Sequence, residues 1–309
     1  MKKFNKVVLT ACVTLLAACC LPFAAAQSNS LLTNEAAPQK SLPTGEGQFT
    51  ILVARGPMNV FTYKPKSFTA NSPVWVVIHG ARRDVAEHSA FDYYDVWMKL
   101  AEDAGALLLV PEFVEHQWPT SWQFQFGNVR TKKLEPVRWE DSGFGAVEFA
   151  FRQAVAMTGS NRHRFSIYGH GGGAQWVQRY VLHSGGRYIE RAVAANPGWY
   201  LLPDNEFTYP YGLNKAPIAQ DTLRSAFGTR FTLLLGQDDR RTTGIIRDNK
   251  QTRAQGANRY ERGHFYFKRA SADAQRIGAR FVWQLREVPG AGHENEDMAP
   301  AAAEVLKGR

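Results

Sequence analysis

The chain has 309 residues, of which 44% are apolar and 21% are charged. This length suits one large α/β domain or two small ones, and the composition is that of a folded globular protein, which excludes a wholly disordered chain. The formal net charge is +9 and falls by three, to +6, without the three lysines of the leader. Such a mild basic excess does not indicate nucleic-acid binding, and we expect no nucleic-acid partner.

Residues 1–26 are predicted to be a signal peptide. Three lysines within the first six residues form a positive n-region, and the apolar residues 7–18 that follow are too few to span a bilayer. The small residues 24–26 suit signal peptidase, whereas residues 16–19 resemble a bacterial lipobox that would leave Cys19 acylated. Both alternatives predict export, to the periplasm or the medium, and only the second predicts membrane attachment, through the lipid on Cys19.

The mature chain begins with a stretch that is predicted to be flexible. Residues 27–45 are rich in Ser, Asn, Ala, Pro and Gln and are typical of a disordered tether. All three cysteines lie in the leader, so the mature chain has neither a disulfide nor a cysteine nucleophile. No spacing of residues indicates a metal site, and we expect neither a metal nor another cofactor. Residues 46–309 are predicted to form one domain.

Strands and helices alternate through this domain, which is typical of an α/β fold. Apolar runs predict strands at 49–53, 60–63, 74–78, 106–111, 164–168, 191–196, 231–236 and 280–285. Apolar residues at helical spacing predict helices at 92–104, 140–157 and 174–182, and a short helix closes the chain. A turn at Gly56-Pro57 is expected to join the first two strands. The continuous run 74–78 suits a central parallel strand that is buried on both faces.

Two stretches without a clear period are candidates for the walls of a binding site. Residues 113–126 carry five aromatic side chains: Phe113, Trp118, Trp122, Phe124 and Phe126. These are compatible with a substrate-binding rim for a polymer or a hydrophobic group, and equally with a satellite core under a long loop. Residues 197–227 are predicted to be a lid-like insertion, and they contain further aromatic residues at Trp199, Tyr200, Tyr209 and Tyr211.

The segment Gly169-His170-Gly171-Gly172-Gly173 lies between a predicted strand and a predicted helix. This is the setting of the nucleophile elbow, G-x-S-x-G, whose outer residues must be small because the strand and helix backbones approach closely. Gly169 and Gly173 meet that requirement, but Gly171 occupies the position of the serine. A dinucleotide-binding G-x-G-x-x-G motif fits less well, because Ala174 stands at its last glycine position, although that motif tolerates alanine there.

Three further motifs follow the ends of predicted strands. His79-Gly80-Ala81 comes directly after the apolar strand 74–78, about 90 residues before the elbow. Asp238 and Asp239 come just beyond the strand 231–236. Gly292-His293 follows the last strand and precedes the C-terminal helix.

The chain order of elbow, acid and histidine, with a His-Gly segment upstream, resembles the α/β-hydrolase superfamily. The resemblance covers roughly residues 47–308, and it points to secreted bacterial serine esterases and polyester depolymerases. It implies an α/β-hydrolase fold, with a mostly parallel central sheet and helices on both faces. It also implies that the substrate is a small-molecule or polymeric ester-like compound.

The resemblance implies a role for each motif. His293 corresponds to the general base, and Asp239 corresponds to the acid that orients it, with Asp238 as the alternative. The backbone N–H groups of Ala81 and Gly172 correspond to the oxyanion hole. Together these groups would form a serine-hydrolase site around the elbow.

Gly171 departs from the family pattern, because glycine has no side chain that could form an acyl-enzyme. We therefore expect an exported relative of carboxylic-ester or polymer hydrolases in which hydrolysis is lost, or reduced to what a His–Asp pair can do with water. The alternative is an envelope pseudoenzyme that only binds an acyl or anionic ligand. A third interpretation takes Gly171 as a changed residue in an active serine hydrolase. A tight His–acid pair aimed at position 171 would favour chemistry over binding alone.

Residues 240–280 carry eleven lysines and arginines against three acids, a local balance of +8. The segment begins directly after the acid motif, so part of it is expected to face the active site. It is compatible with attraction of an anionic ligand, an anionic polymer or the bacterial envelope, and also with an ordinary solvated surface.

Overall fold

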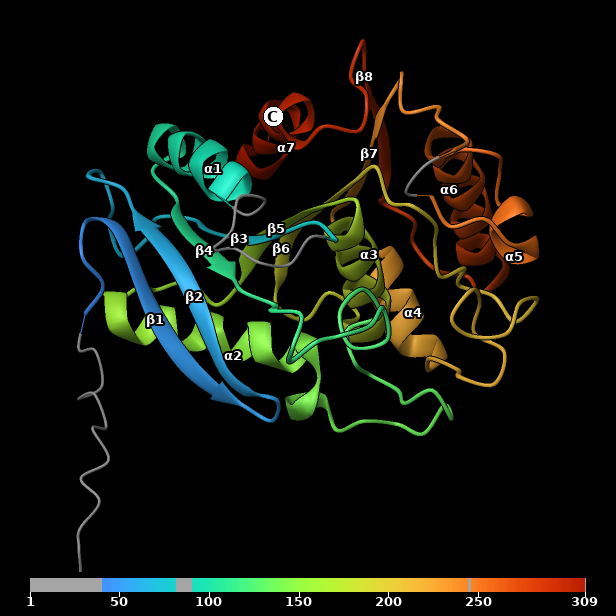
Figure 1. Ribbon diagram of the computed structural model, residues 1–309, viewed down its shortest axis with the longest axis horizontal. Helices are drawn as coiled ribbons and strands as arrows, with labels where there is room; N and C mark the ends of the chain where they lie inside the picture. Colours follow the sequence, from blue (N-terminus) through green and yellow to red (C-terminus); the bar gives the residue numbers. More distant parts are fainter. Residues whose placement is uncertain (1–40, 82–90, 244–245, 309) are drawn as a thin grey trace, which may run out of the picture. The chain divides into compact units, whose positions relative to one another are not determined.

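The computed structural model describes residues 41–81, 91–243 and 246–308. The predicted signal peptide and most of the predicted tether lie outside these residues. The described chain is built around an eight-stranded sheet with the order β1-β2-β4-β3-β5-β6-β7-β8 (Figure 1). The strands are β1 (Gly45–Val53), β2 (Gly56–Lys64), β3 (Val74–Ile78), β4 (Leu107–Pro111), β5 (Phe165–His170), β6 (Ile189–Ala195), β7 (Phe231–Gly236) and β8 (Gln284–Val288). Only the pairs β1–β2 and β2–β4 are antiparallel, so the sheet is mostly parallel, as predicted.

Helices cover both faces of this sheet, which confirms the predicted architecture (Figure 1). They are α1 (Phe91–Ala104), α2 (Gly143–Thr158), α3 (Gly172–Ser184), α4 (Gln220–Phe227), α5 (Lys250–Arg253), α6 (Arg259–Arg276) and α7 (Asn295–Lys307). Helices α1 and α7 pack on one face, whereas α2, α3, α4 and α6 pack on the other. Among the described helices, none combines the length and the apolar character needed to cross a membrane.

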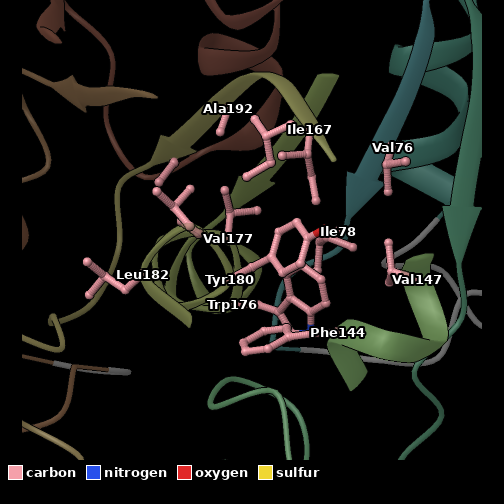
Figure 2. Packing of buried hydrophobic residues seen from close by; sticks show 14 of the residues in the cluster. Val76, Ile78, Phe144, Val147, Ile167, Trp176, Val177, Tyr180, Leu182 and Ala192 are labelled. Carbon is pink, nitrogen blue, oxygen red and sulfur yellow. The ribbon is translucent and has the colours of Figure 1, made fainter. Parts of the chain in front are cut away.

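The central strands are buried on both faces because their side chains alternate between two cores. Val76 and Ile78 of β3 belong to the larger core, whereas Trp75 and Val77 belong to the core under α1 and α7. In the larger core, Phe144 of α2 lies edge-on against an indole ring of α3, with 4.7 Å between the ring centroids (Figure 2). This packing fixes α3, and with it the elbow, against the sheet.

Three predicted boundaries are wrong, each for a local reason. The first hairpin turns at residues 54–55 rather than at Gly56-Pro57, because Val53 pairs directly with Gly56 and leaves a two-residue loop. The predicted helix 140–157 is divided, because Ser142 caps α2 with its hydroxyl and the residues before it form a short 3₁₀ turn, Trp139–Asp141.

The predicted last strand, 280–285, is displaced to Gln284–Val288. Its first residues pack against the end of α4 instead of pairing with β7. The Val282 N–H donates to the Phe227 carbonyl over 3.0 Å, and the Trp283 indole N–H donates to the Ala226 carbonyl over 2.8 Å. Pairing with β7 begins only at Gln284.

Most aromatic side chains of the loop 113–126 pack into the protein, and they join the main core rather than a separate satellite core. The loop reaches the cleft only through polar side chains, Ser121 and Gln125. Phe113, Trp118 and Phe124 are fully buried. The Phe124 ring stacks on the His79 imidazole with 5.2 Å between centroids, and the Phe113 N–H donates to His79 Nε2 over 3.1 Å. The loop therefore holds the His-Gly segment at the end of β3 in place.

The segment predicted as a lid-like insertion, 197–227, is not uniform. Its last eight residues form α4, which packs beside α3 as an ordinary crossover helix before β7. Residues 197–219 contain turns and an isolated bridge between Thr208 and Asn214. The lid-like role of this part stays a prediction.

Candidate active site

Gly171 occupies a strained turn between β5 and α3. Its backbone dihedrals are φ 54° and ψ −107°, a region that side chains rarely adopt and that functional turns use. The neighbouring glycines are required by close contact. A Cβ on Gly169 would lie 2.3 Å from the Gly173 carbonyl oxygen, and a Cβ on Gly173 would lie 2.1 Å from the Ile78 carbonyl oxygen. The outer glycines of the motif therefore allow β3, β5 and α3 to meet at one point.

We expect Gly173→Ala to lower the free energy of unfolding by about 3 kcal/mol, because the added methyl group would collide with backbone that cannot move aside. Chemical denaturation monitored by circular dichroism measures the change. The matched control is Gly292→Ala, where a Cβ has open space and φ is not positive. Equal stability of the two variants would contradict the close approach of α3 to β3.

The side chain of His293 faces position 171. A Cβ built on Gly171 would lie 3.4 Å from His293 Nε2, an ordinary contact distance. The other ring nitrogen, Nδ1, lies 2.7 Å from Oδ2 of Asp239, which is fully buried. His293 follows β8 and Asp239 follows β7, so adjacent parallel strands bring the two side chains to one edge of the sheet. Asp238 is exposed, and the structure does not bring it to His293.

Two groups that the sequence analysis did not single out support the His293–Asp239 pair. Arg259, at the start of α6, is buried, and its Nη1 lies 3.3 Å from Oδ1 of Asp239, the oxygen not used by His293. Asn196 donates its side-chain amide to the Gly292 carbonyl and accepts the Gly236 N–H, each over 2.8 Å. The amide thus ties the loop that carries the histidine to the end of β7. Arg259 lies within the basic segment 240–280, which was the signal available in the sequence.

The backbones of Ala81 and Gly172 are in contact. A Cβ on Gly172 would lie 3.1 Å from the Ala81 nitrogen. Gly172 is the first residue of α3, where the helix dipole adds positive partial charge. Ala81 follows His79, whose ring is held by Phe113 and Phe124. The structure therefore brings together the two residues predicted to form an oxyanion hole.

His170, inside the elbow motif, is a further buried group near the site. Its Nδ1 lies 2.9 Å from the Tyr93 hydroxyl, and its ring centroid lies 4.7 Å from that of His293. Burial, followed by the nearby His293 and Arg259, holds the pKa of His170 well below its usual value. His170 is therefore neutral at ordinary pH and adds no positive charge to the site.

A cleft of about 730 Å³ opens over Gly171, Gly172 and His293. Three arginines line it: Arg241, Arg247 and Arg259. The exposed guanidinium of Arg247 lies over the Trp199 ring, 5.4 Å from its centroid. Glu294 and Glu296 line the side next to His293. The described residues contain no group of three or more side chains suited to hold a metal ion.

The fold of this chain recurs in solved structures. Poly(aspartic acid) hydrolase-1 from Sphingomonas sp. KT-1 is 32% identical, with a TM-score of 0.81 over 86% of this chain and 99% of that chain. The chain belongs to the α/β-hydrolase family. Within this family it is also similar to LpqC, a poly(3-hydroxybutyrate) depolymerase from Bordetella parapertussis, at 29% identity, with a TM-score of 0.79 over 86% of this chain and 92% of that chain. No family model matches the chain, and no curated protein matches it.

An S-formylglutathione hydrolase from Agrobacterium tumefaciens, at 17% identity and a TM-score of 0.53, shares the fold with this α/β-hydrolase. The chain therefore lies among the esterase- and depolymerase-like members of the family, as the sequence motifs predicted.

Proposed function

We propose that this chain is an exported relative of carboxylic-ester and polymer hydrolases that lacks the nucleophile, so that hydrolysis is reduced or lost in the chain as written. One observation carries the proposal. The position that a side chain at residue 171 would occupy lies 3.4 Å from His293 Nε2, while the other nitrogen of the same ring lies 2.7 Å from Asp239. This is the geometry of a base and its orienting acid aimed at a missing hydroxyl.

The remaining groups determine what chemistry is possible. A serine at position 171 would attack the substrate carbonyl, His293 would take its proton, and the N–H groups of Ala81 and Gly172 would stabilise the negative charge on the oxygen. With glycine, His293 can act as general base only on water. Sites of this kind without a complete triad still accelerate hydrolysis about 10³–10⁴-fold over water, through the oxyanion hole and binding. We therefore propose weak, water-dependent ester hydrolysis at most.

The tight pair favours this proposal over a role in binding alone. A protein that only captures a ligand has no need for a buried acid hydrogen-bonded to a histidine and also held by Arg259 at its second oxygen.

The first test is hydrolysis of a short-chain nitrophenyl ester by the chain and by its Gly171→Ser variant, with fluorophosphonate labelling of both proteins. Inactivity of both, with the variant folded, would overturn the proposed site.

Export remains part of the proposal and depends on the leader. The positive n-region, the short apolar stretch and the small residues 24–26 support it. Expression of the full chain in a bacterial host, with cell fractionation and mass spectrometry of the processed N-terminus, would separate signal-peptidase cleavage from acylation at Cys19.

We further propose that the ester-like substrate carries negative charge on the part that contacts the arginines of the cleft. The cleft is lined by Arg241 and Arg247, both exposed and without a carboxylate partner among the described residues. Arginine is well suited to hold carboxylates, because its guanidinium offers paired donors. The relative from Sphingomonas sp. acts on poly(aspartic acid), which agrees with such a preference.

We expect the paired substitution Arg241→Gln and Arg247→Gln, in the Gly171→Ser background, to raise KM for nitrophenyl hydrogen succinate about tenfold, because a charge-assisted contact is lost. KM for neutral nitrophenyl butyrate should stay unchanged. Steady-state kinetics with both esters gives the ratio of the variant's KM to the parent's KM for each ester. Arg240→Gln is the control, because Arg240 lies on the same loop but stacks on Tyr260, 4.0 Å from its ring centroid, and does not line the cleft. Equal shifts with both esters would contradict charge recognition.

A further inference from the structure

A second basic depression lies at the opposite edge of the sheet from the elbow. Gly171 and Asp239 follow the carboxyl ends of β5 and β7, whereas this groove, of about 920 Å³, is formed where β5, β6 and β7 begin. Because neighbouring strands are parallel, their amino ends meet at one edge. β5 has six residues, so the two edges are separated by about 20 Å at 3.3 Å per residue. The groove is therefore separate from the active-site cleft.

The groove is strongly cationic. It is lined by five arginines and one histidine against a single acid, Glu190. Arg162 is paired with Glu190, and Arg187 is paired with Glu148. The other three arginines, Arg164, Arg230 and Arg280, are exposed and form no ion pair or side-chain hydrogen bond with any described residue. Three uncompensated guanidinium groups thus line one concave surface.

The convergence of these arginines is set by the fold rather than by one charged segment. Arg164 precedes β5, Arg230 precedes β7, and Arg280 lies in the stretch before β8. Elsewhere the chain neutralises its arginines where acids are near, as Arg269 does with Asp204 and Glu206. Like charges that gather without partners repel one another, and a bound anion relieves that repulsion.

The chemistry of the lining restricts the ligand. None of the groove's lining residues is Phe, Tyr or Trp, so it lacks the stacking surfaces that single-stranded nucleic acids use. The apolar residues of the lining are only Ile189, which is buried, and Val282. The groove therefore presents too little apolar surface to bind acyl chains. The remaining wall is formed by small or polar residues, among them Gly185, Gly186 and Gly228.

We propose that this groove binds a segment of an acidic polymer through its carboxylates, as an anchoring site distant from the cleft. The choice of a carboxylate polymer rests on the proposed function, in which the cleft itself takes an anionic, ester-like substrate. Carboxylates suit arginine because two parallel N–H donors match two oxygens. A chain held at a second point has a raised effective concentration at the cleft, which increases overall affinity without any new contact there.

The test measures binding and needs no catalysis. Fluorescence anisotropy of end-labelled poly(aspartic acid), titrated with the chain as written at low and at physiological salt, gives the affinity. We expect the triple variant Arg164→Gln, Arg230→Gln, Arg280→Gln to bind about tenfold or more weakly. The control variant Lys132→Gln, Lys133→Gln, Lys268→Gln removes the same number of exposed charges outside the groove, and its affinity should change less than about twofold.

Three results would overturn the assignment. Unchanged affinity of the groove variant, with both triple variants folded by circular dichroism, would exclude the site. An equal loss of affinity in both triple variants would mean that the polymer is attracted by the net charge of the protein alone. Equally tight, groove-dependent binding of polyphosphate or of a single-stranded oligonucleotide would exclude a carboxylate-specific site. The binding experiment uses the chain with glycine at position 171. An inactive Gly171→Ser variant would therefore refute the proposed function but would leave the measured affinity of the groove unchanged.

Discussion

We expect the Gly171→Ser variant to hydrolyse a short-chain nitrophenyl ester about 10⁴-fold faster than the chain as written. The Cβ of the new side chain would lie 3.4 Å from His293 Nε2, so its hydroxyl can reach the base without moving either backbone. Asp239 already holds the ring through Nδ1, which leaves Nε2 to accept the proton. The hydroxyl would therefore complete the site that we propose.

The main cost of this substitution is backbone strain. A non-glycine residue at φ 54° and ψ −107° costs about 1–3 kcal/mol. Gly171→Ala is the matched control, because it adds the same Cβ and the same strain but no hydroxyl. We expect fluorophosphonate to label the serine variant alone and the alanine variant to stay as inactive as the parent. Activity that is equal in all three proteins would place the nucleophile elsewhere.

The sequence was most informative where a single short segment decides the geometry. Gly169 and Gly173 can be recognised as elbow residues because their requirement is local: a strand and the helix after it must approach within contact distance. The order of acid and histidine after parallel strands is also visible in the sequence. Parallel strands bring their carboxyl ends to one edge, so an acid after β7 could be expected beside His293. The sequence preferred Asp239 but left Asp238 as the alternative.

The parts that the sequence did not reveal depend on contacts between distant segments. Arg259 reaches Asp239 only because α6 packs beside the end of β7, and nothing in its sequence neighbourhood distinguishes it from the other arginines of 240–280. The aromatic loop was ambiguous for a related reason. Whether Phe113 and Phe124 face a ligand or a core is decided by His79, which lies about 35–45 residues away in the chain. Similarly, residues 281–283 look like a strand but are held by the end of α4.

The second large effect concerns the buried acid. In the Gly171→Ser background, we expect Asp239→Asn to lower kcat about 10⁴-fold with little change in KM. An asparagine keeps the shape of the side chain, but its amide can present N–H to His293 Nδ1. The ring would then carry its proton on Nε2, where it cannot accept the proton of the serine. Steady-state kinetics with a nitrophenyl ester, on protein whose fold is verified by circular dichroism, gives both parameters.

Asp238→Asn is the matched control for that experiment, because the neighbouring acid is exposed and is not brought to His293. Its kcat should stay within about twofold of the Gly171→Ser parent, since the charge of an exposed carboxylate is largely screened by water and salt. Asp239 also holds Arg259, so part of any loss could come from a displaced guanidinium. Arg259→Gln separates the two contributions: it leaves the carboxylate on His293 and should therefore cost far less in kcat than Asp239→Asn. If Asp238→Asn were the damaging substitution, the orienting acid would have to be reassigned.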